Sequence, residues 1–311
     1  MNVLVCFQHN FVMPCGVMLY SLLSNNRHWP LFVYAIVDED VTDSDKNDIF
    51  IITQKFNQCV LTFSKISKAL TRVFPKARNK RFDKSVYYRL LAASSLPEKV
   101  EKVIYLDCDT IVRGDLISLW SYDLDGIGIA GVMNQSQREE YFNRLGLSRQ
   151  RRYLNSGVLI LNLAYWRIHN KEDEMLAYIQ SNSKILKNPD QDVLNVVFCD
   201  CHKELPLKYN AQSGFFYKTR YLEDGLRIYI DEIKRLPADA AILHFTGWDK
   251  PWMKPCYHSL KSEFLKYKGC TQWKDEDLLF FPLIYRIKRK AKVLLCKLGI
   301  YNYVDISELY R

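Results

Sequence analysis

The chain has 311 residues, and its 44 Lys and Arg against 35 Asp and Glu give a formal net charge of +9. Hydrophobic residues make up 48% of the sequence, which excludes a disordered protein, because disordered chains bury too little apolar surface to offset their entropy. With only 12 Gly and 10 Pro, the chain is neither collagen-like nor of low complexity, and its length allows a large buried core.

The N-terminus and the cysteines both indicate a protein that stays in the cytoplasm. The chain begins Met1-Asn2-Val3 without a basic segment, so we expect no signal peptide. The sequence contains no run of about 18 apolar residues, so we expect no membrane-spanning helix. The nine Cys are scattered and form no CxxC pair, which is typical of reduced thiols. Cys199, Cys201 and His202 form the one tight cluster, but a zinc site needs a second ligand pair.

The excess positive charge is concentrated near the C-terminus. Residues 285–297 hold six basic and no acidic side chains, so the rest of the chain carries 9 − 6 = +3. Apolar clusters flank this run within residues 278–300, a pattern that predicts an amphipathic helix at a membrane surface. We therefore divide the chain into a catalytic domain, residues 1–265, and a membrane-associating tail, residues 266–311.

Apolar runs and helical spacing predict strands and helices that alternate through the first 110 residues. We expect strands at 3–7, Leu31–Val37, 60–63 and 103–106, and helices at 14–25, 42–56 and 84–95. This alternation predicts an α/β fold with a doubly wound, Rossmann-like sheet. Farther along we expect strands at 155–163 and 240–245, and helices at 171–181 and 189–198.

Paired carboxylates that follow a strand are the first candidate for chemistry. The sequence holds six Asp-x-Asp triplets, which begin at residues 38, 43, 107, 123, 190 and 275. Only those at 38 and 107 follow strong strands, and residues i and i+2 of an extended chain share one side. At the carboxyl end of a strand such a pair suits Mn²⁺ or Mg²⁺ held with a substrate phosphate. We favour Asp107 and Asp109, because their strand lies near the middle of the sheet-forming region.

Two enzyme classes use an acidic pair in this place. In haloacid-dehalogenase-like phosphatases the first Asp, here Asp107, is a nucleophile. The other class, the nucleotide-sugar glycosyltransferases, uses the pair to hold a cation on the diphosphate. Ile111 stands where the phosphatases carry Thr or Val, and the pair lies more than 100 residues into the chain. Both points argue against the phosphatase.

Several blocks in a fixed order resemble the family 8 retaining glycosyltransferases, in particular bacterial enzymes that extend lipopolysaccharide and other surface glycans. These blocks begin at the first strand and continue with DCDTIVRGDL at 107–116, YLNSGVLILNL at 153–163, DQDVLN at 190–195, Tyr209-Asn210 and HFTGWDKPW at 244–252. The resemblance implies a GT-A fold, in which a Rossmann-like nucleotide-binding sheet is fused to an acceptor-binding region.

The resemblance assigns a metal site and a role in catalysis to matching residues. Asp107, Asp109 and His244 match the family's metal ligands, and mixed oxygen and nitrogen ligation suits Mn²⁺, with Mg²⁺ as the alternative. Lys250 matches a lysine that stabilises the UDP leaving group. Gly247 matches a glycine that lets the backbone approach the phosphates.

The resemblance also implies a set of residues around the UDP-sugar. Those expected to bind the donor are Gln8, Asn10, Arg89, Asp107, Cys108, Asp109, Asn155, Ser156, Gly157, Asp190, Gln191, His244, Gly247 and Lys250. Asp190 and Gln191 join Lys250 as the expected catalytic residues. Because a neutral amide is a poor nucleophile, Gln191 favours a front-face route, in which the acceptor attacks on the side that UDP leaves.

Two positions depart from the family pattern. Gln8 stands where an Asp commonly contacts the uracil, although the neighbouring Asn10 still matches. Asn134 stands where an Asp is common near the acceptor. The first change concerns base selectivity and the second the acceptor, while the reaction class is unaffected.

The sequence thus predicts a metal-dependent retaining transferase that moves glucose or galactose from a UDP-sugar to a glycan or lipid-linked acceptor. We expect a cytoplasmic enzyme held on the inner face of the plasma membrane by its tail, through anionic lipids. No recognised nucleic-acid-binding fold accompanies the basic run, so we expect no nucleic-acid partner. A phosphatase and a non-catalytic membrane-bound sugar-nucleotide binder are the alternatives.

Overall fold

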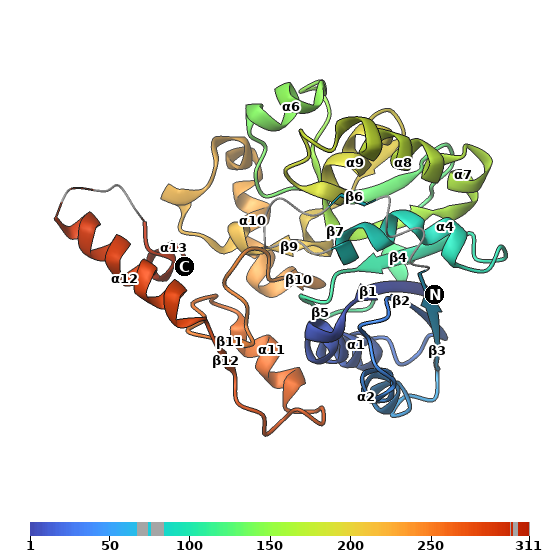
Figure 1. Ribbon diagram of the computed structural model, residues 1–311, viewed down its shortest axis with the longest axis horizontal. Helices are drawn as coiled ribbons and strands as arrows, with labels where there is room; N and C mark the ends of the chain where they lie inside the picture. Colours follow the sequence, from blue (N-terminus) through green and yellow to red (C-terminus); the bar gives the residue numbers. More distant parts are fainter. Residues whose placement is uncertain (67–73, 76–83, 299, 301–303, 311) are drawn as a thin grey trace.

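The computed structural model describes residues 1–66, 74–75, 84–298, 300 and 304–310 (Figure 1). Its centre is a seven-stranded sheet in the order β3-β2-β1-β4-β7-β6-β8. The strands are β1 (Asn2–Phe7), β2 (Leu31–Val37), β3 (Cys59–Lys65), β4 (Lys102–Leu106), β6 (Ile129–Met133), β7 (Leu154–Asn162) and β8 (His202–Glu204). Strands β3, β2, β1 and β4 are parallel, whereas β7 runs antiparallel to β4 and β6. The predicted α/β class is confirmed, with a mixed sheet.

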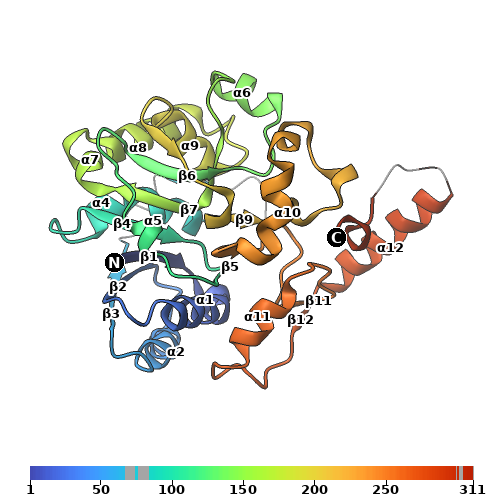
Figure 2. The same cartoon turned by 180° about the vertical axis from the view of Figure 1, so that it is seen from behind.

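Alternate residues of the central strands belong to two different cores. Val3 and Val5 pack on one face of the sheet, whereas Leu4 and Cys6 pack on the other. The first face is covered by α1 (Val12–Asn25) and α2 (Asp43–Thr53), and the second by α7 (Leu163–Ile168), α8 (Lys171–Asn182) and α9 (Pro189–Val197) (Figures 1 and 2). Burial on both faces explains why these strands are continuous apolar runs.

The predicted α-helix at 84–95 is instead a 3-10 helix, Lys84–Leu91, followed by the short helix α4 (Ala92–Ser95). Residues 87–91 are five consecutive buried residues. An amphipathic surface helix leaves one side to solvent, so its pattern does not fit this segment. Helix α2 is also shorter than expected, and it begins after Thr42, whose side chain accepts a hydrogen bond from the backbone N–H of Asp45.

A small second sheet joins the end of β4 to a distant part of the chain. It consists of β5 (Thr110–Val112), β10 (Ile242–His244) and β9 (Ala211–Gln212), with β10 in the middle. The register pairs His244 with Thr110 and with Gln212. Since Thr110 directly follows Asp109, this pairing brings Asp109 and His244, which are 135 positions apart in the sequence, close together.

Shorter elements connect these two sheets. They are α5 (Ile117–Trp120), α6 (Glu139–Leu145), α10 (Ile230–Asp239), α11 (Lys261–Lys268) and the 3-10 helices His9–Phe11, Leu207–Tyr209, Ser213–Phe216, Thr219–Tyr221 and Asp224–Tyr229. After α11, Trp273 is buried and its ring fills the space beside Gly16. The division predicted at residue 265 falls within α11, and the part that projects from the body begins after Trp273.

The C-terminal part forms a projecting helix and then returns to the body (Figures 1 and 2). A two-stranded ladder, β11 (Met253–Lys254) with β12 (Leu279–Phe280), leads into α12 (Leu283–Lys297). Apolar side chains of α12 are exposed, including Leu283 at 67% and Leu294 at 58%. The last helix, α13 (Ile306–Leu309), ends where Tyr310 packs against the Tyr217 ring. No helix in the described part of the chain combines the length and apolarity needed to cross a bilayer.

Candidate active site

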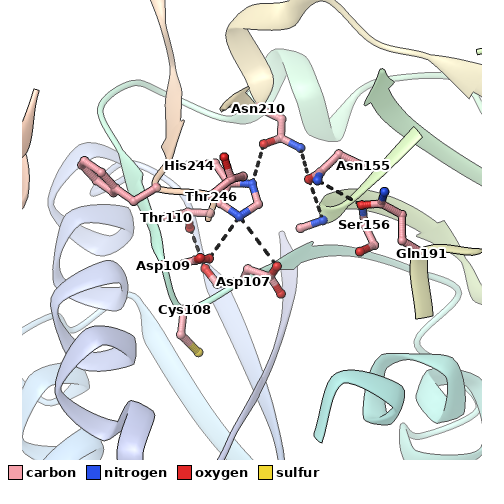
Figure 3. Close-up of polar contacts among 12 residues, drawn as sticks. Asp107, Cys108, Asp109, Thr110, Asn155, Ser156, Gln191, Asn210, His244 and Thr246 are labelled. Atoms are coloured by element: carbon pink, nitrogen blue, oxygen red, sulfur yellow. Dashed lines mark hydrogen bonds and ion pairs between the residues drawn. The ribbon is translucent and has the colours of Figure 1, made fainter. Parts of the chain in front are cut away.

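Two acidic side chains lie directly beyond the carboxyl end of β4. The backbone N–H of Asp107 donates to the carbonyl of Gly157 on β7, and the backbone N–H of Phe245 donates to the carbonyl of Asp109. Asp107 and Asp109 point toward His244, whereas the intervening Cys108 points away from them (Figure 3). The Cys108 thiol instead donates to the carbonyl of Cys6, so its side chain belongs to the core.

Asp107, Asp109 and His244 form a triad of side chains that fits a divalent cation. One ligand atom of each lies within 4.8 Å of the others. Nε2 of His244 is 3.1 Å from Oδ1 of Asp109 and 3.8 Å from Oδ2 of Asp107. Two carboxylate oxygens and one imidazole nitrogen on one side of a space leave coordination positions for substrate oxygens. Within the described ranges this is the one group of three or more such residues that converges.

A lysine and a histidine determine the charge of Asp109. The ammonium of Lys250 contacts Oδ2 of Asp109 and donates to the carbonyl of Phe245 at 2.6 Å. Burial opposes ionisation of Asp109, but Lys250 and His244 outweigh it and hold the pKa of this carboxyl well below its usual range. Asp109 is therefore ionised at neutral pH, as a cation ligand must be.

Gly157 has no side chain, and the space that a side chain would fill is occupied by the ligands of the triad. A Cβ atom on this residue would lie 2.1 Å from Cε1 of His244 and 2.7 Å from Oδ2 of Asp107. Neither neighbour is the loose end of a flexible side chain, because His244 is buried and Asp107 is held at its other oxygen. A glycine at this position is thus a requirement of the triad itself.

Arg89 connects the first aspartate to a second buried carboxylate. Its Nη2 lies 2.9 Å from Oδ1 of Asp107, and its Nη1 lies 3.2 Å from Oδ2 of Asp190. Nη1 also donates to the carbonyl of Ser156 at 2.8 Å. Burial alone lowers the pKa of the Arg89 guanidinium, but Asp107 and Asp190 more than reverse this and raise it well above its ordinary value. Arg89 therefore stays charged in the wall of the site.

One carboxylate oxygen of Asp190 has the Arg89 guanidinium as its charged neighbour. Its Oδ2 is buried and accepts no hydrogen bond from the described residues, although the Arg89 guanidinium lies nearby. Burial raises the pKa of the Asp190 carboxyl, and Arg89 opposes that shift. An oxygen of this kind can accept a hydrogen bond from a hydroxyl group that enters the site.

Tyr105 is a site residue that the sequence analysis missed. Its hydroxyl donates to Oδ1 of Asp107 at 2.6 Å, and the guanidinium of Arg89 lies 4.3 Å from the centre of its ring. Burial raises the pKa of the Tyr105 hydroxyl well above its ordinary value, so it remains a donor. Its position two residues before Asp107 on the same strand is the signal that could have revealed it.

A chain of side-chain hydrogen bonds leads from His244 to Gln191 (Figure 3). Nδ1 of His244 lies 2.8 Å from Oδ1 of Asn210, and Nδ2 of Asn210 donates to Oδ1 of Asn155 at 2.9 Å. Nδ2 of Asn155 in turn donates to Oε1 of Gln191 at 3.1 Å, and the backbone N–H of Ser156 donates to the same oxygen at 3.2 Å. Asn210 belongs to one of the blocks that resemble the family, but it was not among the residues predicted to form the site.

These groups lie in a cleft of about 890 Å³. Most of the residues predicted to bind the donor line it, namely Gln8, Arg89, Asp107, Cys108, Asp109, Asn155, Ser156, Asp190, Gln191, His244, Gly247 and Lys250. Asn10 lies in the exposed 3-10 helix after β1 and is not part of the lining, and Gly157 lies behind the triad. Gly247 has a φ of +83°, a conformation that favours glycine.

The far side of the cleft carries residues that the sequence did not single out. Tyr141, Tyr217, Tyr221 and Glu223 line it, and Phe281, Pro282 and Tyr285 extend it to the start of α12. Asn134, expected near an acceptor, is also part of the lining, and its side chain donates to the carbonyl of Ser136 at 2.9 Å. Aromatic rings beside polar groups are suited to the apolar and hydroxyl faces of a sugar.

The cysteine cluster gives no metal group. Nδ1 of His202 lies 3.1 Å from the carbonyl of Phe198, and the Cys199 thiol lies 3.5 Å from the Asp200 carboxylate. Each of these side chains thus has a local partner of its own. The nine cysteines, all within the described ranges, form no disulfide.

Comparison with known proteins identifies the family. The family model "Glycosyl transferase family 8" matches residues 2–256. General stress protein A of Bacillus subtilis (strain 168) is 27% identical over 278 residues, which cover 88% of this chain and 94% of that protein. A lipopolysaccharide 1,2-glucosyltransferase of Escherichia coli (strain K12) is 29% identical over 301 residues, covering 95% of this chain and 85% of that protein.

A solved structure shares the architecture. The crystal structure of the galactosyltransferase LgtC in complex with donor and acceptor sugar analogues superimposes with a TM-score of 0.75, at 20% identity, and covers 93% of this chain and 100% of that chain. This likeness identifies the fold as GT-A, in agreement with the mixed sheet and the paired aspartates beyond β4. With a family model that spans residues 2–256, the chain belongs to glycosyl transferase family 8.

Proposed function

We propose that the protein is a divalent-cation-dependent retaining glycosyltransferase that moves a hexose, glucose or galactose, from a UDP-sugar to a glycan or lipid-linked acceptor. The observation that carries this proposal is the convergence of Asp107, Asp109 and His244 in the same cleft as the Arg89–Asp190 pair. The names of relatives that act on lipopolysaccharide support a bacterial surface glycan as the acceptor.

The triad and Lys250 are suited to the diphosphate of the donor. Asp107, Asp109 and His244 would hold Mn²⁺ or Mg²⁺, which supplies positive charge to the diphosphate oxygens. Lys250 contacts Asp109 in the structure, so its ammonium lies beside the cation site. There it can stabilise the charge that develops on UDP as the glycosidic bond breaks. Gly247, with its positive φ and no side chain, would let the backbone of this loop approach the phosphates.

The other end of the cleft floor is suited to the hexose. The carboxylate of Asp190, which lines the cleft and is held by Arg89, can accept a hydrogen bond from a sugar hydroxyl. Asn155 and Ser156 border the same space. Choice between glucose and galactose rests on a single hydroxyl, so we assign the donor to this pair of hexoses.

The hydrogen bonds of Gln191 favour the front-face route. Its Oε1 already accepts from Asn155 and from the backbone of Ser156, so the group left for the substrate is the –NH₂ donor. An amide that offers hydrogen cannot attack the anomeric carbon. In the proposed step the acceptor oxygen bonds to that carbon as the bond to UDP breaks, and the acceptor proton passes to a phosphate oxygen. Attack on the face that UDP leaves retains the configuration.

Other residues of the lining are suited to the base and the acceptor. Gln8, at the end of β1, can pair with the uracil imide through its amide, whereas Asn10 lies outside the lining. Asn134, Tyr141, Tyr217 and Tyr221 belong to the same lining and would contact the acceptor. A cytoplasmic enzyme held at the inner leaflet by α12, whose basic and exposed apolar side chains suit an anionic surface, would meet a lipid-linked acceptor there.

The test is transfer or hydrolysis of radiolabelled UDP-glucose and UDP-galactose with Mn²⁺, with a chelator control. We expect release of UDP that stops when EDTA is added, and an Asp109→Asn variant that no longer binds UDP in a Mn²⁺-dependent manner. Turnover that is insensitive to EDTA, or metal-dependent UDP binding that survives in Asp109→Asn, would contradict the ligand set. Release of phosphate from p-nitrophenyl phosphate would support the phosphatase instead, and binding without turnover would support a non-catalytic binder.

A further inference from the structure

Asn210 is completely buried between the candidate cation site and the candidate hexose site (Figure 3). It follows the 3-10 helix Leu207–Tyr209 and precedes β9, which pairs with β10 so that Gln212 lies opposite His244. This pairing brings the amide of Asn210 within 2.8 Å of the His244 ring on one side and 2.9 Å of Asn155 on the other. One side chain therefore contacts both halves of the site.

The direction of these hydrogen bonds is fixed by the backbone. The N–H of Gly157 can only donate, and it lies 3.0 Å from the side-chain oxygen of Asn155. That oxygen also faces the Asn210 amide, so Asn210 must present its –NH₂ group there. The amide oxygen of Asn210 is then the atom that faces His244.

The tautomer of His244 follows from this direction. Because the Asn210 oxygen can only accept, Nδ1 of His244 carries the hydrogen, so Nε2 is the ring atom that can give a lone pair to a cation. Nε2 is the ring atom that lies beside the oxygens of Asp107 and Asp109. A histidine that ligates a metal usually donates its other ring N–H to an oxygen acceptor in this way.

The second branch of the chain ends at Gln191. The backbone N–H of Ser156 identifies the Gln191 atom that it meets as the amide oxygen, and Nδ2 of Asn155 donates to the same atom. Asn155 thus has its oxygen toward Asn210 and its –NH₂ toward Gln191. A reversal of Asn210 would place two oxygens face to face at Asn155.

We infer that Asn210 is a positioning residue that sets His244 for the cation and, through Asn155, sets Gln191 for the hexose. The inference rests on the proposed metal-dependent hexose transfer. Its basis is that position 210 must offer an acceptor to one neighbour and a hydrogen to the other. A primary amide meets both demands, whereas a carboxylate meets only the first and an aliphatic side chain meets neither.

Two substitutions of Asn210 test separately the acceptor toward His244 and the hydrogen toward Asn155. Asn210→Asp keeps an oxygen toward His244 but places a second oxygen against Asn155, so we expect Mn²⁺ affinity to stay within about threefold of the unmodified protein. We expect the same variant to bind UDP-hexose no more tightly than UDP. Asn210→Leu removes both bonds and should lower Mn²⁺ affinity roughly 10- to 100-fold, the usual effect of losing a partner of a metal-ligating histidine. Isothermal titration with Mn²⁺, then with UDP and UDP-hexose, measures each effect.

Asn26 provides a matched control. It is also a buried asparagine, which donates to the carbonyls of Leu22 and Gly114 and accepts from the backbone of Leu116, far from the cleft. Asn26→Leu should lower the melting temperature and leave Mn²⁺ affinity unchanged. Equal Mn²⁺ affinity in Asn210→Leu and Asn26→Leu would overturn the inference, as would equal loss of Mn²⁺ affinity in Asn210→Asp and Asn210→Leu.

A spectroscopic measurement tests the same point without any change at position 210. In ¹⁵N-histidine-labelled protein loaded with Mg²⁺, the His244 signals are those that disappear in His244→Gln. We expect the ring hydrogen at Nδ1, and a hydrogen at Nε2 would overturn the inference. Because neither this signal nor Mn²⁺ binding requires turnover, failure of the proposed transfer reaction can be told apart from failure of this inference.

Discussion

Behind the triad of Asp107, Asp109 and His244, Gly157 occupies a position where a side chain would collide with two of these ligands. Its φ is not positive, so alanine is compatible with the backbone, and the cost of a Cβ comes from the contacts with His244 and Asp107. A methyl group there must displace one of the two ligands. A substitution of Gly157 by alanine should therefore disrupt the cation site without unfolding the protein.

We predict that Gly157→Ala lowers Mn²⁺ affinity by roughly tenfold or more, since displaced ligands no longer converge. Isothermal titration with Mn²⁺ measures the change. Gly114→Ala is the matched control, because the nearest atom to its Cβ lies 3.5 Å away, and it should bind Mn²⁺ normally. Normal Mn²⁺ affinity in Gly157→Ala would show that the cation does not bind between these residues.

Single residues also show the limits of the sequence. The paired aspartates were found from their place after a strong strand, and His244 and Lys250 because their block resembles a family. Tyr105 and Asn210 were missed because they act through other side chains, and their roles depend on a sheet register that no local pattern states. Asn10 matched the family pattern, yet the turn after β1 places it outside the cleft lining.

Among the elements, the long strands and helices were predicted well, whereas β5, β6 and β8 were not predicted. The runs that became β1, β2 and β4 are continuous and apolar because both of their faces are buried, and that signal is strong. The segment 84–95 was predicted as an α-helix, since its spacing alone does not reveal that all of residues 87–91 are buried. Short strands such as β9 form because a neighbouring strand pairs with them, and no local sequence pattern predicts them.

Helix α12 is the element that the account assigns to the membrane. It has no acidic side chain, its basic residues include Lys288 and Lys290, and its apolar residues are exposed. We predict that Lys288→Gln/Lys290→Gln weakens binding to vesicles containing phosphatidylserine by roughly 30-fold, from about 1 kcal/mol per basic residue. Co-sedimentation with vesicles measures this change.

Lys234→Gln/Arg235→Gln, on exposed α10, removes the same charge from another face and should leave vesicle binding intact. Equal weakening by both double variants would point to the net charge of the protein. Unchanged binding in the α12 variant would remove the membrane role from this helix.

For the whole molecule, the packing around His258 links the C-terminus to the loop that carries Lys250. The His258 ring lies among Phe216, Phe245 and Tyr310. Its Nδ1 accepts the backbone N–H of Leu260 at 3.1 Å, and burial lowers the pKa of His258 to about 3. The folded protein therefore holds this histidine neutral.

We predict that stability falls as pH decreases from about 6.5 toward 3. The unfolded chain takes up a proton at His258 near its ordinary pKa of 6.5, whereas the folded protein does so only near 3. Between these values the unfolded state binds more protons, so acid favours unfolding. In His258→Asn, which keeps an acceptor for Leu260, the melting temperature should fall less between pH 7 and pH 5. An identical decline in both proteins would contradict this origin.

In the proposed function, one cleft uses a cation, Lys250 and the Arg89–Asp190 pair to transfer a hexose with retention of configuration. The most direct measurement is ¹H NMR of the anomeric proton during Mn²⁺-dependent hydrolysis of UDP-glucose or UDP-galactose, recorded before mutarotation equilibrates the product. We predict that the α-anomer of the free hexose appears first and that EDTA stops its formation. Initial appearance of the β-anomer, or no turnover of either donor with Mn²⁺, would contradict the account.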